Sequence, residues 1–207
     1  MNDFDVLVEA VPISGRTVID VGCGDGALVK RLRAAGADAL GLDLDVERAR
    51  EADPDGRYLA AGGEALPLED ASVDVAILMR SLHHIPDPDA ALRELRRVVR
   101  DSVYVAEPLP EGEYFELMRI VDDETDVLAG AQAALARAAG FERIHSVSYD
   151  VTMRIDDFEE VRERVLAADP GRAARLASVE DELRARFRPG EYAPPMRADL
   201  LRVVQLP

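Results

Sequence analysis

Three glycines at alternate positions, Gly22, Gly24 and Gly26, follow the apolar segment 17–21. Glycine has no Cβ atom, so the backbone at these positions can turn sharply and lie close against a bound molecule. A carboxylate, Asp20, stands just before the turn, where the carboxyl ends of strands in an α/β sheet border a ligand crevice. The spacing therefore predicts a cofactor-binding turn between a buried strand and a helix.

Two classes of cofactor fit this turn. Gly22-x-Gly24-x-x-Ala27 satisfies the dinucleotide fingerprint, which accepts alanine at its last position. Asp43 lies near the spacing expected of a ribose-binding acid, so NAD is one candidate. A second pattern, Asp20-x-Gly22-x-Gly24-x-Gly26, begins two residues earlier. The other segments of the chain must decide which class of cofactor the turn binds.

With Asp20 included, the turn strongly resembles that of the class I S-adenosylmethionine-dependent methyltransferases. Three more segments are similar to this family in order and spacing: 62–74, 76–85 with its paired histidine, and 91–98. The resemblance is to the small-molecule, methyltransferase-11-like and ubiquinone-biosynthesis-like subgroup, and it covers residues 1–107 well and the later strands in outline. It implies a Rossmann-like α/β fold: a seven-stranded, mainly parallel sheet in a three-layer α/β/α sandwich, with the last strand antiparallel.

The resemblance also implies an activity, methyl transfer from S-adenosylmethionine to a small-molecule acceptor. This cofactor carries an ammonium group and no phosphate, so a carboxylate at Asp20 suits it, whereas a pyrophosphate would be repelled. Positioning of the two reactants supplies most of such catalysis, and neither a triad nor a metal is required. A non-catalytic S-adenosylmethionine-binding module is the alternative. An NAD-dependent oxidoreductase is less favoured, because Lys30 is the only lysine available for a tyrosine–lysine proton relay.

Cofactor contacts are carried over residue by residue. Asp43 closes the second strand and would accept hydrogen bonds from both ribose hydroxyls. The segment from Gly62 would border the adenine; the family often has aspartate at that position, so the N–H groups of Gly63 or Glu64 would replace it. The predicted cofactor-binding residues are Asp20, Gly22, Cys23, Gly24, Gly26, Asp43, Leu44, Gly63, Glu64, Ala65 and Arg80.

The catalytic candidates are His83 and His84, two of the three histidines, at the mouth of the expected crevice. A histidine there could take a proton from a hydroxyl or amine of the acceptor, and packing beneath the next helix is the alternative. No metal site is expected, because adjacent side chains tend to diverge and no third ligand is evident. Glu107, at the end of the fifth strand, is a substrate-side candidate or an ion-pair partner. Arg80 could equally pair with an acid, and Cys23 is expected to be unreactive.

Apolar segments and helix signals alternate along the chain in an order that favours a parallel sheet with right-handed crossovers. Asp45 and Asp87 are predicted helix caps, the second followed by Pro88. Strands are expected over 17–21, 39–43, 57–60, 73–79, 103–107, 144–148 and 198–204. Besides the helices after the glycine turn, Asp45 and Asp87, helices are expected over 3–10, 114–120, 132–139, 156–168 and 172–187.

The length of 207 residues predicts a single domain, 1–207, with substrate-lid elements at about 109–131 and 151–196. The net charge of −16 would repel phosphate backbones, so nucleic acid is not an expected partner. No apolar run is long enough to span a membrane, and residues 1–5 lack the pattern of a signal peptide. With its single cysteine, the chain is predicted to be cytoplasmic. The acidic run 122–126 is expected to be a solvated loop that could favour cationic or amine acceptors.

Overall fold

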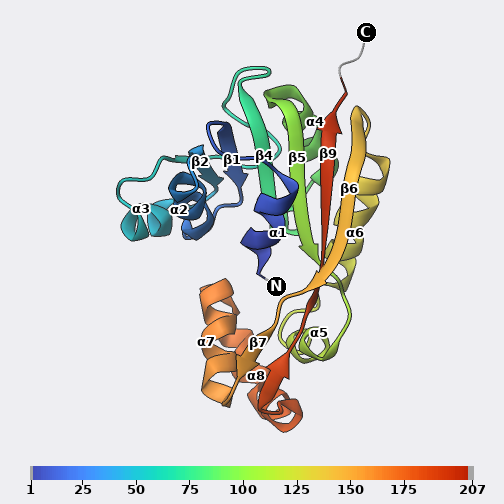
Figure 1. The fold of residues 1–207 in the computed structure, drawn as a ribbon. Helices are drawn as coiled ribbons and strands as arrows, with labels where there is room; N and C mark the ends of the chain where they lie inside the picture. The colour runs from blue at the N-terminus through green and yellow to red at the C-terminus, as the bar shows by residue number, and fades with distance from the viewer. Residues whose placement is uncertain (1, 205–207) are drawn as a thin grey trace.

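The computed structural model describes residues 2–204, which form a seven-stranded sheet with helices on both faces (Figure 1). The strand order is β3-β2-β1-β4-β5-β9-β6. The first five strands are parallel, and β9, the last strand of the chain, runs antiparallel between β5 and β6. The predicted fold class is confirmed. The strands are β1 (Thr17–Val21), β2 (Asp38–Asp43), β3 (Tyr58–Ala60), β4 (Val73–Met79), β5 (Val99–Pro108), β6 (Phe141–Asp150) and β9 (Pro195–Val203).

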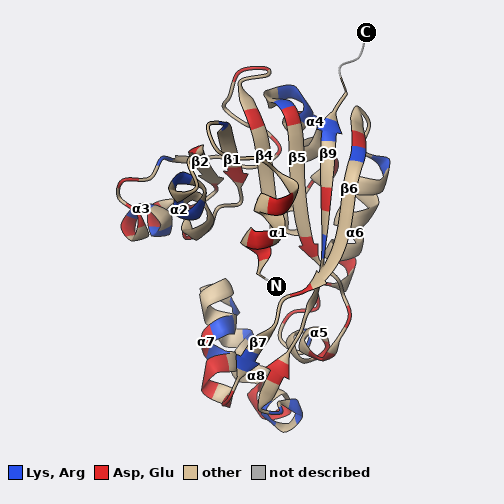
Figure 2. Ribbon diagram, viewed as in Figure 1, with Lys and Arg blue, Asp and Glu red and all other residues tan. Residues whose placement is uncertain are grey.

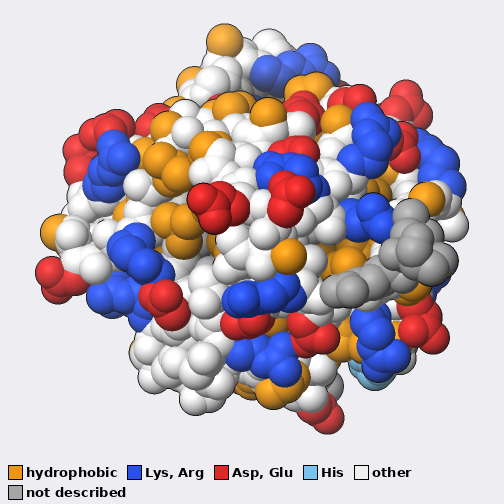
Figure 3. Space-filling model, turned by 90° about the horizontal axis from the view of Figure 1, so that it is seen from above, with side chains coloured by type: hydrophobic (Ala, Val, Ile, Leu, Met, Phe, Trp, Pro, Cys, Tyr) orange, Lys and Arg blue, Asp and Glu red, His pale blue; other side chains and the backbone are white. Residues whose placement is uncertain are grey.

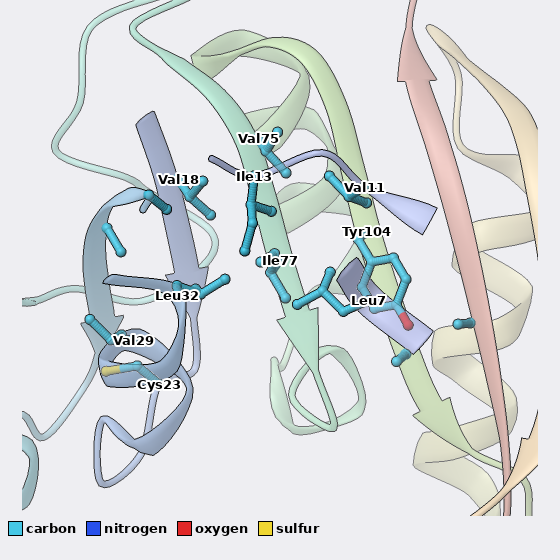
Figure 4. Packing of buried hydrophobic residues seen from close by; sticks show 14 of the residues in the cluster. Leu7, Val11, Ile13, Val18, Cys23, Val29, Leu32, Val75, Ile77 and Tyr104 are labelled. Carbon is cyan, nitrogen blue, oxygen red and sulfur yellow. The ribbon is translucent and has the colours of Figure 1, made fainter. Parts of the chain in front are cut away.

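The central strand β4 is covered on both faces, as its largely apolar sequence predicts. Val75 and Ile77 point to one face, where α1 (Asp3–Ala10), α2 (Ala27–Ala34) and α3 (Glu47–Ala52) pack (Figure 4). Ala76 and Leu78 point to the other face, against α4 (Pro88–Val98) and α6 (Thr125–Arg137). All four side chains are fully buried. Because side chains of β4 are buried on both faces of the sheet, the strand is fixed in the middle of the core. The residues that follow its carboxyl end are therefore held in a defined position.

A third hydrophobic cluster lies beyond the carboxyl ends of the strands, below the sheet in Figure 1. Its fully buried members include Ile155 and Leu183. We call this part of the molecule the cap. It consists of α5 (Glu113–Met118), β7 (Met153–Ile155), α7 (Phe158–Ala168), the 3-10 turn η2 (Pro170–Arg172), α8 (Ala173–Arg186) and β8 (Gly190–Tyr192).

The cap falls within the expected lid segments, with differences in detail. Helix α6 begins at Thr125 rather than 132 and packs on the sheet, so residues 125–131 are not part of the cap. The two-stranded sheet of β7 and β8 was not predicted, because three-residue strands next to proline and glycine carry little hydrophobic pattern. Treatment of 1–207 as one domain stays a prediction, and residues 1 and 205–207 of that range lie outside the described residues.

Acidic and basic side chains are mixed over the surface. Figure 2 places both charges on the sheet layers and on the cap, and on the face seen in Figure 3 basic side chains lie beside acidic ones. Many are ion-paired, such as Arg100 with Asp74 at 2.9 Å. Among the described residues, no helix is long and apolar enough to cross a membrane.

Candidate functional site

The glycine turn after β1 packs directly against the end of β4. Gly22 has a φ of +81°, and a Cβ atom there would lie 2.4 Å from the Cβ atom of Ser81. The Ser81 hydroxyl donates a hydrogen bond of 2.6 Å to the carbonyl of Val21. Glycine is therefore required at this position for two reasons, the left-handed backbone and the contact with β4.

A cavity of about 810 Å³ opens at this edge of the sheet, between the strand ends and the cap. Its volume lies toward the upper end of the ~300–1,000 Å³ that is typical of small-molecule sites. Nine of the predicted site residues line it: Gly22, Gly24, Asp43, Leu44, Gly63, Glu64, Arg80, His83 and His84. Five do not: Asp20, Cys23, Gly26, Ala65 and Glu107.

Asp43, at the end of β2, is held in place by the backbone around it. Its carboxylate accepts hydrogen bonds from the N–H of Gly24 at 2.9 Å and from the N–H of Asp45 at 3.2 Å. Asp45 in turn accepts from the N–H of Glu47, the start of α3. Gly24 has a φ of +54° and open space where a Cβ atom would lie. The remaining lone pairs of the half-buried Asp43 carboxylate therefore face the cavity from a fixed position.

Asp20 lies behind the cavity lining, on β1, and is only 2 % exposed. Burial, followed by the nearby Asp43 and Asp25 carboxylates, raises the pKa of this carboxyl to about 7. Three acids thus converge on one glycine turn. A positively charged ligand would relieve their mutual repulsion, and an anionic ligand would increase it.

Cys23 and Gly26 face away from the cavity, toward Tyr58. A Cβ atom on Gly26 would lie 2.4 Å from the Tyr58 hydroxyl oxygen. Cys23 is buried in the sheet core, and burial, followed by Asp20 and Asp43, raises the pKa of its thiol to about 12. The expected lack of reactivity agrees with this placement, because the thiolate is the reactive form.

The expected adenine-side segment lines the cavity with Gly62, Gly63 and Glu64, while the next residue, Ala65, does not. Gly63 is pressed against Ile85, whose Cδ1 atom would lie 2.6 Å from an added Cβ atom. Glu64 accepts a hydrogen bond of 3.4 Å from the N–H of Asp87.

Arg80 lines the cavity from the exit of β4 with a φ of +57°, which is unusual for a residue other than glycine. Its guanidinium pairs with Asp3 of α1 at 2.9 Å, so the ion-pair alternative is the one seen here. The same Asp3 carboxylate accepts a hydrogen bond from the Tyr149 hydroxyl at 2.8 Å. Arg80 therefore ties the first helix to the rim of the cavity.

Glu107 lies beneath the cavity rather than in its wall, with 1 % of its surface exposed. One carboxylate oxygen accepts hydrogen bonds from the N–H groups of Ser81 and Leu82, at 3.2 and 2.8 Å. The other oxygen bonds to Nδ1 of His83. In place of the expected contact with substrate, the carboxylate holds His83 so that its other nitrogen, Nε2, is free for the cavity.

His83 and His84 do not diverge as expected. Their ring centroids are 3.9 Å apart, and ligand atoms of both lie within 4.8 Å of a Glu124 oxygen. That carboxylate is already paired with Arg172 at 2.9 Å, which places a positive charge beside the cluster. The pKa of His84 is lowered, first by desolvation in the cavity wall and then by the neighbouring His83. The absence of a metal stays a prediction. Diverging side chains and a missing third ligand no longer argue for it, because the rings lie together and Glu124 is near both. The positive charge of Arg172 beside Glu124 is the argument that the structure offers.

Sequence reasoning missed two groups that line the cavity. The sequence does not indicate a role for Ser81, because that role depends on a contact with the glycine turn, which is distant in the chain. Arg164 and Arg172 come from α7 and η2 of the cap, 80 or more residues after the histidines. No local signal connects such distant residues.

Part of the chain is similar in sequence to known methyltransferases. Residues 19–106, less than half of the chain, match the family described as "Methyltransferase domain". An uncharacterized methyltransferase from Mycobacteroides abscessus is 38% identical over 108 residues, 48% of this chain and 42% of that protein. A ubiquinone biosynthesis O-methyltransferase from Ralstonia nicotianae is 34% identical over 110 residues, 49% of this chain and 46% of that protein. The matched parts thus span less than half the length of these curated relatives.

The structural similarity extends over nearly the whole chain. The solved structure of a SAM dependent methyltransferase from Aquifex aeolicus superposes with a TM-score of 0.59 at 17% identity, covering 97% of this chain and 89% of that one. At this identity the similarity establishes the Rossmann-like methyltransferase fold, including the part of the chain that the family match does not reach.

The buried Asp20 carboxyl predicts an unusual pH dependence of stability. Its pKa is about 7 in the folded state against 3.8 ordinarily, so between these values the folded chain binds a proton that the unfolded chain releases. This contribution to the free energy of unfolding is complete below pH 3.8 and is lost as the pH rises through 7. Denaturant unfolding of the wild type relative to Asp20→Asn should show a loss of about 2–3 kcal/mol between pH 5 and pH 8. Parallel pH profiles for the two proteins would contradict the assignment.

The Glu107–His83 contact predicts a defined tautomer. The carboxylate can only accept, so neutral His83 should carry its proton on Nδ1. In Glu107→Gln, the amide oxygen still accepts hydrogen bonds from the N–H groups of Ser81 and Leu82, and the NH₂ group faces Nδ1 of His83. Because the NH₂ group can only donate, the proton of His83 should move to Nε2. Long-range ¹H–¹⁵N spectra distinguish the two forms, with the exposed His145 as an internal control. The same His83 tautomer in both proteins would refute the proposed geometry.

Proposed function

We propose that this chain, whose residues 19–106 match the family described as "Methyltransferase domain", transfers the methyl group of S-adenosylmethionine to a small-molecule acceptor. The observation that carries the proposal is the convergence of Asp20, Asp25 and Asp43 on a glycine turn that borders the cavity. Such a cluster favours a cationic cofactor over a dinucleotide, because a pyrophosphate would add negative charge to it.

The residues present fit this cofactor. Asp43 offers free carboxylate lone pairs at the cavity for a ribose diol, and Gly24 leaves open space next to them. Asp20 and the turn Gly22–Gly24 suit the ammonium end, and the segment Gly62–Glu64 supplies a backbone edge for the adenine. When bound, the cofactor supplies a methyl group activated by a positively charged sulfur.

His83 is assigned the role of general base toward the acceptor. Glu107 holds its Nδ1, so that Nε2 of the neutral ring has a free lone pair for a hydroxyl or ammonium proton. The carboxylate also stabilises the imidazolium that forms. Glu107 is a positioning residue here, since its oxygens are fully engaged beneath the cavity. His84, exposed to the cavity and with a lowered pKa, remains neutral at pH 7 and can accept a hydrogen bond from the acceptor.

Calorimetric titration with S-adenosylhomocysteine and, separately, with NAD tests the proposal. S-adenosylhomocysteine should bind, NAD should not, and Asp43→Ala should weaken S-adenosylhomocysteine binding about 10- to 100-fold, the value of hydrogen bonds to a charged group. Asp38→Ala is the matched control. Asp38 lies at the other end of the same strand and pairs with Arg57, so this change should leave the affinity unaltered.

Absence of S-adenosylhomocysteine binding, or unchanged affinity in Asp43→Ala, would reject the proposed cofactor. Methyl-labelled S-adenosylmethionine with a panel of acceptors then distinguishes an enzyme from a non-catalytic binding module.

A further inference from the structure

The cap closes the acceptor side of the cavity with a largely apolar wall. Tyr114, Phe115 and Met118 line it from α5, and Val165 lines it from α7. Val121, which follows α5, continues the same surface. Val121 and Val165 belong to the buried cluster of the cap, and Tyr114 and Met118 pack against it, so most of the wall is supported from behind. A wall of this composition suits a ligand whose body is apolar.

Arginine side chains pair with several of the acids beside this wall, and one of them, Arg172, is shared by three carboxylates. Arg172 pairs with Asp122 at 2.8 Å and with Glu124 at 2.9 Å, and its Nε atom lies 3.8 Å from Asp169. Asp123, in the same acidic run, pairs with Arg119. Three of the four carboxylates in the run thus have an arginine partner, and the idea that the run favours cationic acceptors stays a prediction.

Two polar groups of the wall have no such partner. Among residues 2–204, the structure gives the Arg164 guanidinium no carboxylate within ion-pair distance, and it gives the Tyr114 hydroxyl no hydrogen-bond partner. Both side chains line the cavity, from α7 and α5, and Arg164 has the largest effect of any charged group on the pKa of Tyr114. Burial raises the pKa of Tyr114, so its hydroxyl keeps its proton and is a donor. A guanidinium and a phenol O–H thus border the same apolar wall, both as free donors.

We propose that Arg164 and Tyr114 bind a carboxylate group carried by an otherwise apolar methyl acceptor, an inference that rests on the proposed function. A guanidinium presents two parallel N–H donors that match the two oxygens of a carboxylate, and the phenol adds a third donor. The apolar part of the acceptor would lie against Phe115, Met118 and Val165, where burial of its surface contributes further.

The carboxylate site lies on the same side of the cavity as the catalytic histidines. Ligand atoms of both histidines lie within 4.8 Å of a Glu124 oxygen, Glu124 pairs with Arg172, and these residues line the same cavity as Tyr114. An acceptor held at Arg164 by its carboxylate would therefore extend along the apolar wall toward His83 and His84. The anionic end then fixes the distance at which the reacting atom meets the base.

Calorimetric titration of the S-adenosylhomocysteine-loaded protein with octanoate and with the uncharged octanamide tests the site. Octanoate should bind at least tenfold more tightly, and its affinity should fall with added salt. Arg164→Gln should reduce the octanoate-to-octanamide affinity ratio about 10- to 100-fold, as expected for hydrogen bonds to a charged group, and Tyr114→Phe should reduce it severalfold. Arg162→Gln removes a charge from the same helix but outside the cavity wall, and the ratio should not change.

Equal binding of the two probes, no binding of octanoate, or a ratio that survives Arg164→Gln would each overturn the carboxylate site. If S-adenosylhomocysteine still binds in the same samples, the carboxylate site alone is overturned and the proposed function stands. If S-adenosylhomocysteine fails to bind, the proposed function is rejected, and the same titrations on the protein alone decide whether the carboxylate site exists.

Discussion

The cavity depends on one close contact, between the glycine turn after β1 and the exit of β4. Gly22 leaves no room for a side chain because Ser81 occupies that space, and the Ser81 hydroxyl binds the Val21 carbonyl. The same segment is held from below by Glu107, which accepts the N–H groups of Ser81 and Leu82 and bonds to His83. One compact set of contacts therefore positions both the glycine turn and His83. A shift of either strand end would disturb both together.

Charge determines what this arrangement can hold. Three acidic groups surround the glycine turn, and burial, followed by the Asp43 and Asp25 carboxylates, raises the pKa of Asp20 to about 7. Across the cavity, Arg172 is shared by Asp122, Glu124 and Asp169, whereas Arg164 has no carboxylate partner among the described residues. Arg164 is therefore the group on that side that can receive an anionic ligand. A cationic cofactor at one end and an anionic acceptor at the other would each relieve an uncompensated charge.

Sequence reasoning succeeded where the information is local or periodic. The glycine spacing gave the turn, Asp43 followed from its place at the end of the second strand, and the apolar run of β4 placed the histidines at the cavity. It could not determine side-chain direction inside the turn, where Gly22 and Gly24 face the cavity and Cys23 and Gly26 face Tyr58. Glu107 is a clear case of long-range dependence. Its role follows from the register between β4 and β5, which no spacing within either strand reveals. The cap was located only in outline, because its ion pairs join residues such as Glu124 and Arg172 that are far apart in the chain.

The central claim is that the glycine turn and Asp43 hold S-adenosylmethionine or its product. The most direct measurement is a crystal structure of the protein with S-adenosylhomocysteine. We expect both ribose hydroxyls within hydrogen-bond distance of the Asp43 carboxylate, the amino group beside the turn that Asp20 precedes, and the sulfur facing the His83 side of the cavity. A ligand bound elsewhere, or bound in this cavity without contact to Asp43, would contradict the account.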